Sequence, residues 1–339
     1  MKYELKILLC SYAFAPSLGG IETVSKILAD EFRRMGSTVT VATYTPGPGM
    51  EAGHEVLRRP RFSQLYRMAR AADVAWQNNI SMNMLPPLLA ARRPVVVTHQ
   101  TWIARNDGRR GWQDRLKLAA LGAVENVAIS KAIAQKLRAK AVVIGNPFEA
   151  GEFRDLGNEY RTKDIVFAGR LVTAKGCDLA LRSLAILKAD GMRPSLTVIG
   201  DGAEALALKR LTAELELSEQ VTFLGAMREG LGKEVARHKV MVVPSIWAEP
   251  FGVVALEGLA AGCAVVASSG GGLPEAVGPC GMLFPNGDAE ALAAALKELL
   301  TSLPRRERLL AERSQHLEQF LPENVARRYL NVFESTMRK

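Results

Sequence analysis

Cysteine and histidine are both scarce in this sequence, which contains four of each among 339 residues. Cys10, Cys177, Cys263 and Cys280 lie far apart, without the spacing of a zinc site or the density of a disulfide scaffold. The histidines are isolated, and no Asp-x-Asp pair follows a predicted strand. We therefore expect no metal site, and cysteines scattered in this way are typical of a reducing cytoplasm.

Long apolar runs are also absent. Residues 1–10 alternate charge with Leu and Ile and lack a small-residue cleavage site, so we expect no signal peptide. The most apolar stretch, residues 240–269, is interrupted by Glu249, Pro250 and Glu257, which argues for a buried core and against a membrane-spanning helix. We expect a cytoplasmic location, with the inner face of the membrane as the alternative.

The length and the charge distribution both divide the chain in two. A chain of 339 residues exceeds what one hydrophobic core usually organises. Residues 1–150 contain 21 Lys and Arg against 11 Asp and Glu, a net charge of +10, whereas residues 151–339 contain 23 against 24, a net charge of −1. The first half is therefore expected to meet an acidic partner. No nucleic-acid-binding module is recognisable, so we do not expect nucleic acid.

Short apolar runs alternate with longer amphipathic segments, which is typical of parallel α/β sheets. In the first half we predict strands at 6–11, 38–43, 74–77, 95–99, 127–130 and 142–145. In the second half we predict strands at 165–168, 195–199, 221–224, 240–243 and 264–267. A polar stretch between the two series places the domain boundary near residue 150. In such sheets ligands bind beyond the carboxyl ends of the strands.

Two cations follow the first predicted strand of the second half. Gly169, Arg170 and Leu171 come directly after that strand, and Lys175 and Gly176 come a few residues later. A guanidinium offers a fork of donors and an ammonium offers a compact charge, and together they suit a diphosphate. The alternative is a solvated turn with two surface cations.

A pair of glutamates accompanies a helix that is predicted to begin near Gly252. Its first backbone N–H groups, around 251–254, would face a negative ligand, and Glu249 precedes them. Glu257 lies farther along the helix among apolar residues, where a carboxylate needs donors such as ribose hydroxyls. The alternative makes Glu249 a helix-start carboxylate favoured by the dipole and Glu257 a structural acceptor.

Together these segments resemble the signature of the family 4 retaining glycosyltransferases, in which Glu249 and Glu257 match an E-x7-E motif. The resemblance implies the GT-B fold, an α/β architecture of two Rossmann-like, doubly wound domains facing a central cleft. It implies an acceptor-binding domain at 1–150, a nucleotide-sugar-binding domain at 151–320, and a C-terminal helix in 321–339 that packs back on the N-terminal domain. Shorter matches lie at 200–202, 223–225 and 271–275.

The resemblance also implies a role for each of these residues. Arg170 and Lys175 would neutralise the donor diphosphate, and Glu257 would bind the ribose. Glu249 would position the transferred sugar together with backbone groups of Phe251, Gly252 and Val253.

Two features of the first half belong to the same resemblance. His99 ends a predicted strand, where it would hydrogen-bond the transferred sugar as an active-site residue. Gly19 and Gly20 would form a glycine-rich loop that contacts the donor. Without the resemblance, His99 would be a packed strand-end residue and the glycine pair an ordinary turn.

The implied activity is that of a metal-independent retaining glycosyltransferase without a cofactor, which uses a UDP- or GDP-sugar. Its acceptor would be a carbohydrate or a lipid-linked or acidic glycan, as in cell-envelope polysaccharide synthesis. The alternatives are a GT-B nucleotide-sugar epimerase or phosphorylase, and a non-catalytic, membrane-associated nucleotide-binding protein. A dinucleotide-binding dehydrogenase would need a third glycine that the segment 200–202 lacks.

One segment of the first half resembles an interfacial membrane anchor. Between Trp102 and Lys117, two tryptophans are interleaved with four arginines. Aromatic rings and cations of this kind suit anionic headgroups. The alternative is an acceptor loop with a solvated basic face. An anionic membrane surface is therefore a further candidate partner.

Overall fold

The computed structural model describes residues 4–17, 19–51, 53–103, 111–137, 139–227 and 229–338 of the chain. By its internal contacts the chain divides into two compact units. Unit 1 comprises Met1–Pro147 and Phe320–Lys339, and unit 2 comprises Phe148–Gln319. The boundaries expected after residues 150 and 320 lie close to these positions.

Unit 1 is built on an eight-stranded sheet in the order β3-β4-β2-β1-β5-β6-β7-β8. The pairing is parallel except between β3 and β4. The strands are β1 (Lys6–Ser11), β2 (Thr38–Thr43), β3 (Met50–Glu51), β4 (His54–Arg58), β5 (Val74–Asn78), β6 (Val95–His99), β7 (Glu125–Ala128) and β8 (Val142–Val143). Because β1 lies between β2 and β5, the order of the strands reverses at that point.

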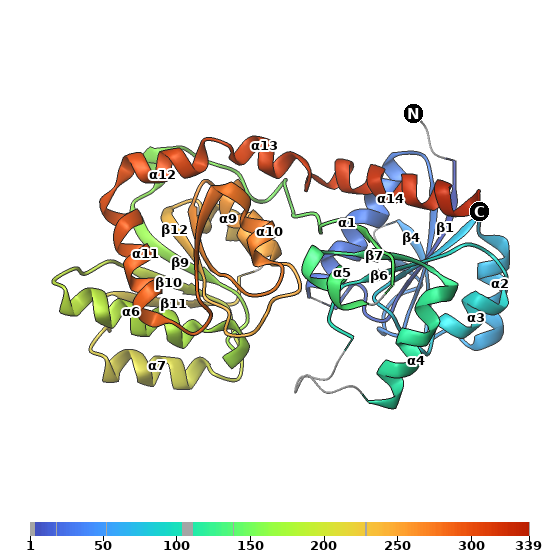
Figure 1. The fold of residues 1–339 in the computed structure, drawn as a ribbon, viewed down its shortest axis with the longest axis horizontal. Coiled ribbons are helices and arrows are strands. Elements are labelled where there is room, and N and C mark those ends of the chain that lie inside the picture. Colours follow the sequence, from blue (N-terminus) through green and yellow to red (C-terminus); the bar gives the residue numbers. More distant parts are fainter. Residues whose placement is uncertain are drawn as a thin grey trace. The chain divides into compact units, whose positions relative to one another are not determined.

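The helices of unit 1 come from both ends of the chain. They are α1 (Gly20–Arg34), α2 (Phe62–Ala71), α3 (Leu85–Ala90), α4 (Trp112–Ala120), α5 (Lys131–Leu137) and α14 (Pro322–Met337). The C-terminal α14 lies along α1 (Figure 1). Its Tyr329 packs 5.3 Å from the ring of Trp76 on β5, measured between centroids, and Phe333 packs 5.5 Å from Phe32 on α1. All four rings are buried, so α14 completes the core of unit 1.

Unit 2 contains six parallel strands in the order β11-β10-β9-β12-β13-β14. The strands are β9 (Lys163–Ala168), β10 (Leu196–Ile199), β11 (Val221–Gly225), β12 (His238–Val243), β13 (Ala264–Ser268) and β14 (Gly281–Phe284). The helices are α6 (Cys177–Ala189), α7 (Ala205–Glu214), α8 (Leu231–Val235), α9 (Val253–Ala260), α10 (Leu273–Val277), α11 (Ala289–Thr301), α12 (Leu303–Leu310) and α13 (Arg313–Glu318). Short 3-10 turns are η1 (Leu121–Ala123) in unit 1, and η2 (Asn158–Tyr160), η3 (Thr173–Lys175) and η4 (Gly278–Cys280) in unit 2.

The central strands of unit 2 are buried on both faces. Ile165 and Phe167 of β9 point into the core shared with α6 and α11, whereas Val166 points to the opposite face. This burial explains the near-continuous apolar runs that predicted these strands. The helix α9 packs on β12 and β13, and none of its buried residues belongs to the α6 and α11 core. Unit 2 is therefore wound in both directions from β9 and β12.

The predicted strand numbers, six and five, were wrong in both units. Of the missed strands, β3 and β14 lie at sheet edges, where one side of each strand has no partner, and β4 lies next to the edge, between β2 and the two-residue β3. In β4 the polar residues His54, Glu55 and Arg58 flank only two adjacent apolar residues, so the segment shows neither an apolar run nor an alternating pattern. The strand β14 follows Gly278 and Pro279, which indicate a turn. The strand predicted at 127–130 begins earlier, at Glu125.

Candidate active site

A pocket of ≈ 360 Å³ lies at the carboxyl ends of the strands in unit 2. Residues after β9, β10 and β11 line it together with the first turns of α9, in the region where the strand order reverses between β9 and β12. Arg170 comes from the loop after β9, and Glu257 comes from α9. The structure thus brings two of the sequence-predicted residues into one pocket. The remaining lining residues are Ala168, Gly169, Ile199, Gly200, Asp201, Ala226, Met227, Leu231 and Val254.

Close backbone contacts hold the loop that carries Arg170. The N–H of Leu171 donates to the carbonyl oxygen of Asp201 at 2.9 Å, and a Cβ at Gly200 would overlap the carbonyl oxygen of Gly169. Gly200 also has a φ of 144°, in a region that other residues rarely adopt. The glycine match at 200–202 therefore has a structural cause, because it lets the loops after β9 and β10 touch.

The start of α9 is fixed by a second set of glycine contacts. Gly252 precedes the helix with a φ of 112°, and the N–H of Ala255 donates to its carbonyl oxygen at 3.0 Å. At Gly258 a side chain would press on Met241 of β12, so the helix lies close to the sheet. Val254, in the first turn, lines the pocket. The first backbone N–H groups of a helix favour an anion, and this helix begins at the pocket.

The Glu257 carboxylate lies half-buried in the pocket and meets no hydrogen-bond donor within the described part of the chain. Burial raises its pKa to about 7, and the nearby charge of Glu149 adds to the shift. A carboxylate in this state is a strong acceptor without a partner. Hydroxyl groups of a ligand would supply the missing donors.

Lys175 and Glu249 form a separate cluster in unit 2. The Nζ of Lys175 lies 2.6 Å from Oε1 of Glu249, and the Ser245 hydroxyl donates to the same oxygen at 2.7 Å. Glu249 is buried, and Lys175 keeps about a quarter of its side-chain surface, 27%, exposed. Sequence reasoning paired Lys175 with Arg170, but Lys175 does not line the pocket of Arg170. It also missed Ser245, because a serine after a strand is not by itself a signal.

The loop around Glu249 is braced from two sides. Its backbone forms a parallel bridge to Gly271, and the N–H of Gly272 donates to the Glu249 carbonyl at 2.7 Å. Gly176, at a φ of 65°, approaches the carbonyl oxygen of Pro244 so closely that a Cβ would overlap it. These contacts fix the backbone that carries Glu249, and the side chain of Phe251, where the chain enters α9, is buried.

His99 ends β6, as predicted, but its side chain is fully buried in unit 1. Its Nε2 lies 3.0 Å from Oδ1 of Asn126, whose amide nitrogen donates to the carbonyl oxygens of Leu121 and Val124. The Asn126 oxygen therefore accepts, and Nε2 carries the proton. Burial lowers the pKa of His99, so the ring is neutral at pH 7. A contact with a sugar would require this ring to become exposed.

The glycine pair marks the start of α1 in unit 1. Gly19 precedes the helix, Gly20 is its first residue, and both are exposed. A Cβ at Gly20 would meet no atom within 4 Å, so packing does not require glycine there. Part of the membrane-anchor segment predicted between Trp102 and Lys117 lies outside the described residues, which exclude 104–110. Its described part includes Trp112, whose surface is 68% exposed.

Residues 149–315 match the family model described as glycosyl transferases group 1. A D-inositol 3-phosphate glycosyltransferase of Stackebrandtia nassauensis is 36% identical over 185 residues, which is 51% of this chain and 42% of that protein. A protein of the same name from Corynebacterium aurimucosum is 34% identical over 193 residues, 54% of this chain and 46% of that protein. The chain thus spans less than half the length of these curated relatives.

A solved structure extends the comparison to nearly the whole chain. HepE of Anabaena, in complex with UDP and glucose, superposes with a TM-score of 0.81 at 19% identity, covering 98% of this chain and 100% of that chain. At this identity the likeness concerns the fold, and it confirms the expected GT-B fold with two Rossmann-like domains. Within the described residues, no helix is long and apolar enough to cross a membrane, and no group of three or more His, Cys, Asp and Glu could hold a metal ion.

The raised pKa of Glu257 predicts an effect of pH on stability. Between the ordinary pKa of 4.5 and about 7, the folded state keeps a proton that the unfolded chain releases, so stability falls as pH rises through this window. Glu257→Gln removes this loss. At pH 8 the variant should be more stable than the wild type by about 1–3 kcal/mol, and near pH 4.5 the two should be alike. Urea unfolding at both pH values tests this, with Glu214→Gln on the exposed side of α7 as the control. A variant that is less stable at pH 8 would contradict the account.

Proposed function

We propose that this protein is a retaining glycosyltransferase that transfers a sugar from a UDP- or GDP-sugar to an acceptor. The pocket of unit 2 supports this proposal most strongly, because it joins Arg170, the start of α9 and the partnerless carboxylate of Glu257. These groups offer a cation and helix N–H groups to a diphosphate, and an acceptor to ribose hydroxyls. The family match over residues 149–315 covers the same groups.

The proposed chemistry is stabilisation of the leaving nucleoside diphosphate. Arg170 and the start of α9 would carry most of the charge that develops on the diphosphate oxygens, without a metal ion. Glu249, held by Lys175 and Ser245, would accept hydrogen bonds from hydroxyls of the transferred sugar. Lys175 could then act twice, as the partner of Glu249 and as a second cation near the diphosphate. Retention of the anomeric configuration is compatible with front-face attack and with a covalent intermediate.

Unit 1 is the proposed acceptor domain, and its charge bears on the kind of acceptor. It contains 25 Lys and Arg against 12 Asp and Glu, a net charge of +13, whereas unit 2 contains 19 against 23, a net charge of −4. An acidic or lipid-linked glycan of the cell envelope fits a basic unit. The names of the two curated relatives also point to an anionic acceptor, inositol 3-phosphate. An epimerase would turn over the donor without an acceptor, and a phosphorylase would need inorganic phosphate.

The diphosphate assignment predicts the behaviour of Arg170→Ala. Loss of one charge-assisted contact costs about 1.5–3 kcal/mol, so UDP or GDP affinity, measured by calorimetry, should fall roughly tenfold to a hundredfold. Arg170 is the cleaner target, because removal of Lys175 would leave the buried Glu249 carboxylate without its cation. The control is Arg182→Ala on α6, whose side chain is 55% exposed in a surface ion pair. Unchanged affinity in Arg170→Ala would refute the assigned diphosphate site.

The two glutamates should differ in what they bind. Glu257→Gln should weaken binding of the bare nucleotide, because ribose is part of both nucleotide and donor. Glu249→Gln should leave nucleotide affinity nearly unchanged and chiefly lower turnover of the intact donor, since the sugar is present only there. Calorimetry with UDP and a coupled assay of UDP release separate the two effects. Equal loss of UDP affinity in both variants would show that the roles are not divided in this way.

The membrane proposal rests on the charge of unit 1 and the exposed Trp112. Polybasic surfaces gain about 1 kcal/mol per Lys or Arg near an anionic bilayer. Sedimentation with anionic vesicles should therefore be salt-sensitive, and it should fall when Arg105, Arg109 and Arg110 are replaced by Ser. UDP affinity should survive that change, because its proposed site is in unit 2. If the wild type does not bind anionic vesicles at low salt, the membrane proposal is wrong, and the basic surface would instead bind a soluble acidic acceptor.

A further inference from the structure

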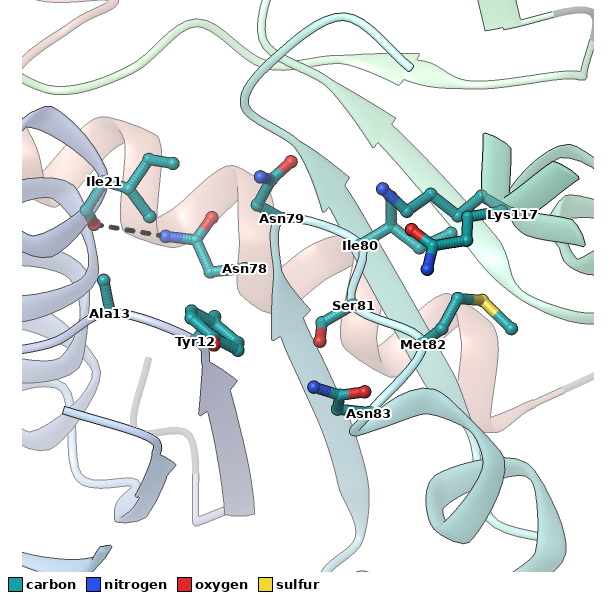
Figure 2. A pocket seen from close by; sticks show the side chains of 11 residues that line it. Tyr12, Ala13, Ile21, Asn78, Asn79, Ile80, Ser81, Met82, Asn83 and Lys117 are labelled. Carbon is teal, nitrogen blue, oxygen red and sulfur yellow. Dashed lines mark hydrogen bonds between the residues drawn. The ribbon is translucent and has the colours of Figure 1, made fainter. Parts of the chain in front are cut away.

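Unit 1 contains a pocket of its own, of ≈ 370 Å³, which the sequence did not indicate. It lies beyond the carboxyl ends of β1 and β5, where the strand order of this sheet reverses. The loop after β5, which carries Asn79, Ser81 and Asn83, forms one part of its wall (Figure 2). Tyr12 follows β1, and Gln113 and Lys117 belong to α4.

The lining of this pocket has a definite chemistry. It offers four amide side chains, a serine hydroxyl and the tyrosine ring, and no Asp or Glu is among its lining residues in the part of the chain that the structure describes. Among its described lining residues, Lys117 is the single cation. Within the described part of the chain, Lys117 forms an ion pair with Asp114, in which Nζ lies 3.9 Å from Oδ1. This distance is too long for a hydrogen bond. The ammonium is therefore available to an anion.

The loop after β5 is held in place before any ligand binds. Asn79 adopts the left-handed conformation, with φ at 69°, and its N–H donates to the carbonyl of Thr98 at 2.8 Å. Gln77 donates to the Ser81 carbonyl at 2.9 Å. Asn78, at the end of β5, donates to Ser25 of α1 at 2.7 Å. Such preorganisation lowers the entropy that binding would otherwise cost.

A network of hydrogen bonds connects Asn78, at the start of this loop, to Gln100 and Asn146. The Gln100 amide donates to Oδ1 of Asn78 at 2.9 Å and to Oδ1 of Asn146 at 3.1 Å, and the Asn146 amide donates back to Gln100 at 2.8 Å. All three side chains are buried. A buried network in which the amides satisfy one another fixes their orientation. The network therefore holds Asn78, which lines the pocket, in a fixed orientation.

We propose that this pocket binds a hydroxyl-rich ring that carries one anionic group, a phosphate or a carboxylate. Lys117 binds the anion, the amides and Ser81 bind hydroxyls, and the exposed ring of Tyr12 covers an apolar face of the ligand. Under the proposed function, on which this inference rests for its biological role, that ligand is the acceptor. Binding itself needs only unit 1 and is measurable without turnover.

The test measures binding of four probes to the full chain with saturating UDP present. The probes are inositol monophosphate and glucuronate as the anions, and inositol and glucose as their uncharged counterparts. We expect at least one anion to bind at least tenfold more tightly than its uncharged counterpart. The preferred anion distinguishes a phosphate site from a carboxylate site. If neither anion binds, or if the uncharged partner binds equally well, the inference is wrong.

Variants assign the effect to Lys117. Lys117→Met should lower the affinity for the preferred anion at least tenfold. Lys140 is an exposed lysine of the same unit, and Lys140→Met should leave this affinity unchanged. Asn83→Asp, which adds a negative charge at an exposed lining position, should also weaken it. Equal anion affinity in Lys117→Met and the wild type would overturn the assignment. UDP affinity is measured in the same samples. If the wild type does not bind UDP, the proposed function is contradicted. If it binds UDP but neither anion, only this inference is contradicted.

Discussion

The reversal of strand order in a doubly wound sheet is the constraint on which both candidate sites depend. Parallel strands end at one edge, and helices that follow neighbouring strands at the reversal leave toward opposite faces. In unit 2 this happens between β9, followed by α6, and β12, followed by α9. In unit 1 it happens between β1, followed by α1, and β5, followed by α3. A hollow remains at each point, and the loops beside it determine what it can bind.

In unit 2 the features of those loops that suit a ligand also lower the stability of the ligand-free protein. Gly176, Gly200 and Gly252 hold positive φ angles in the loops around the pocket and the Glu249 cluster, so the backbone comes closer than side chains would permit. Glu257 keeps a carboxylate half-buried with no donor in the described part of the chain. Each feature lowers the stability of the ligand-free protein. A ligand with a diphosphate and free hydroxyls would supply the donors that the Glu257 carboxylate lacks, and so reverse the loss of stability at Glu257. The Glu249 cluster differs, because Lys175 and Ser245 already satisfy its carboxylate.

The sequence predicted the buried parts of the fold better than its edges. Central strands such as β9 and β12 are apolar on both faces, so their runs stand out, whereas β4 and the edge strand β14 mix polar residues or glycine into short segments. The helix α9 was placed correctly because Pro250 and Gly252 indicate its start. The glutamates and Arg170 were predicted as members of a motif, and a motif gives only the order of residues along the chain. Motifs do not report contacts, so the pairing of Lys175 with Glu249 and the burial of His99 emerged only from the structure.

The most direct measurement is a crystal structure of the protein with UDP. The account predicts that the diphosphate contacts Arg170 and the first N–H groups of α9, and that the ribose hydroxyls donate to the carboxylate of Glu257. The Lys175 ammonium should stay within reach of Glu249. A nucleotide bound elsewhere, or bound in this pocket with its ribose away from Glu257, would contradict the central claim.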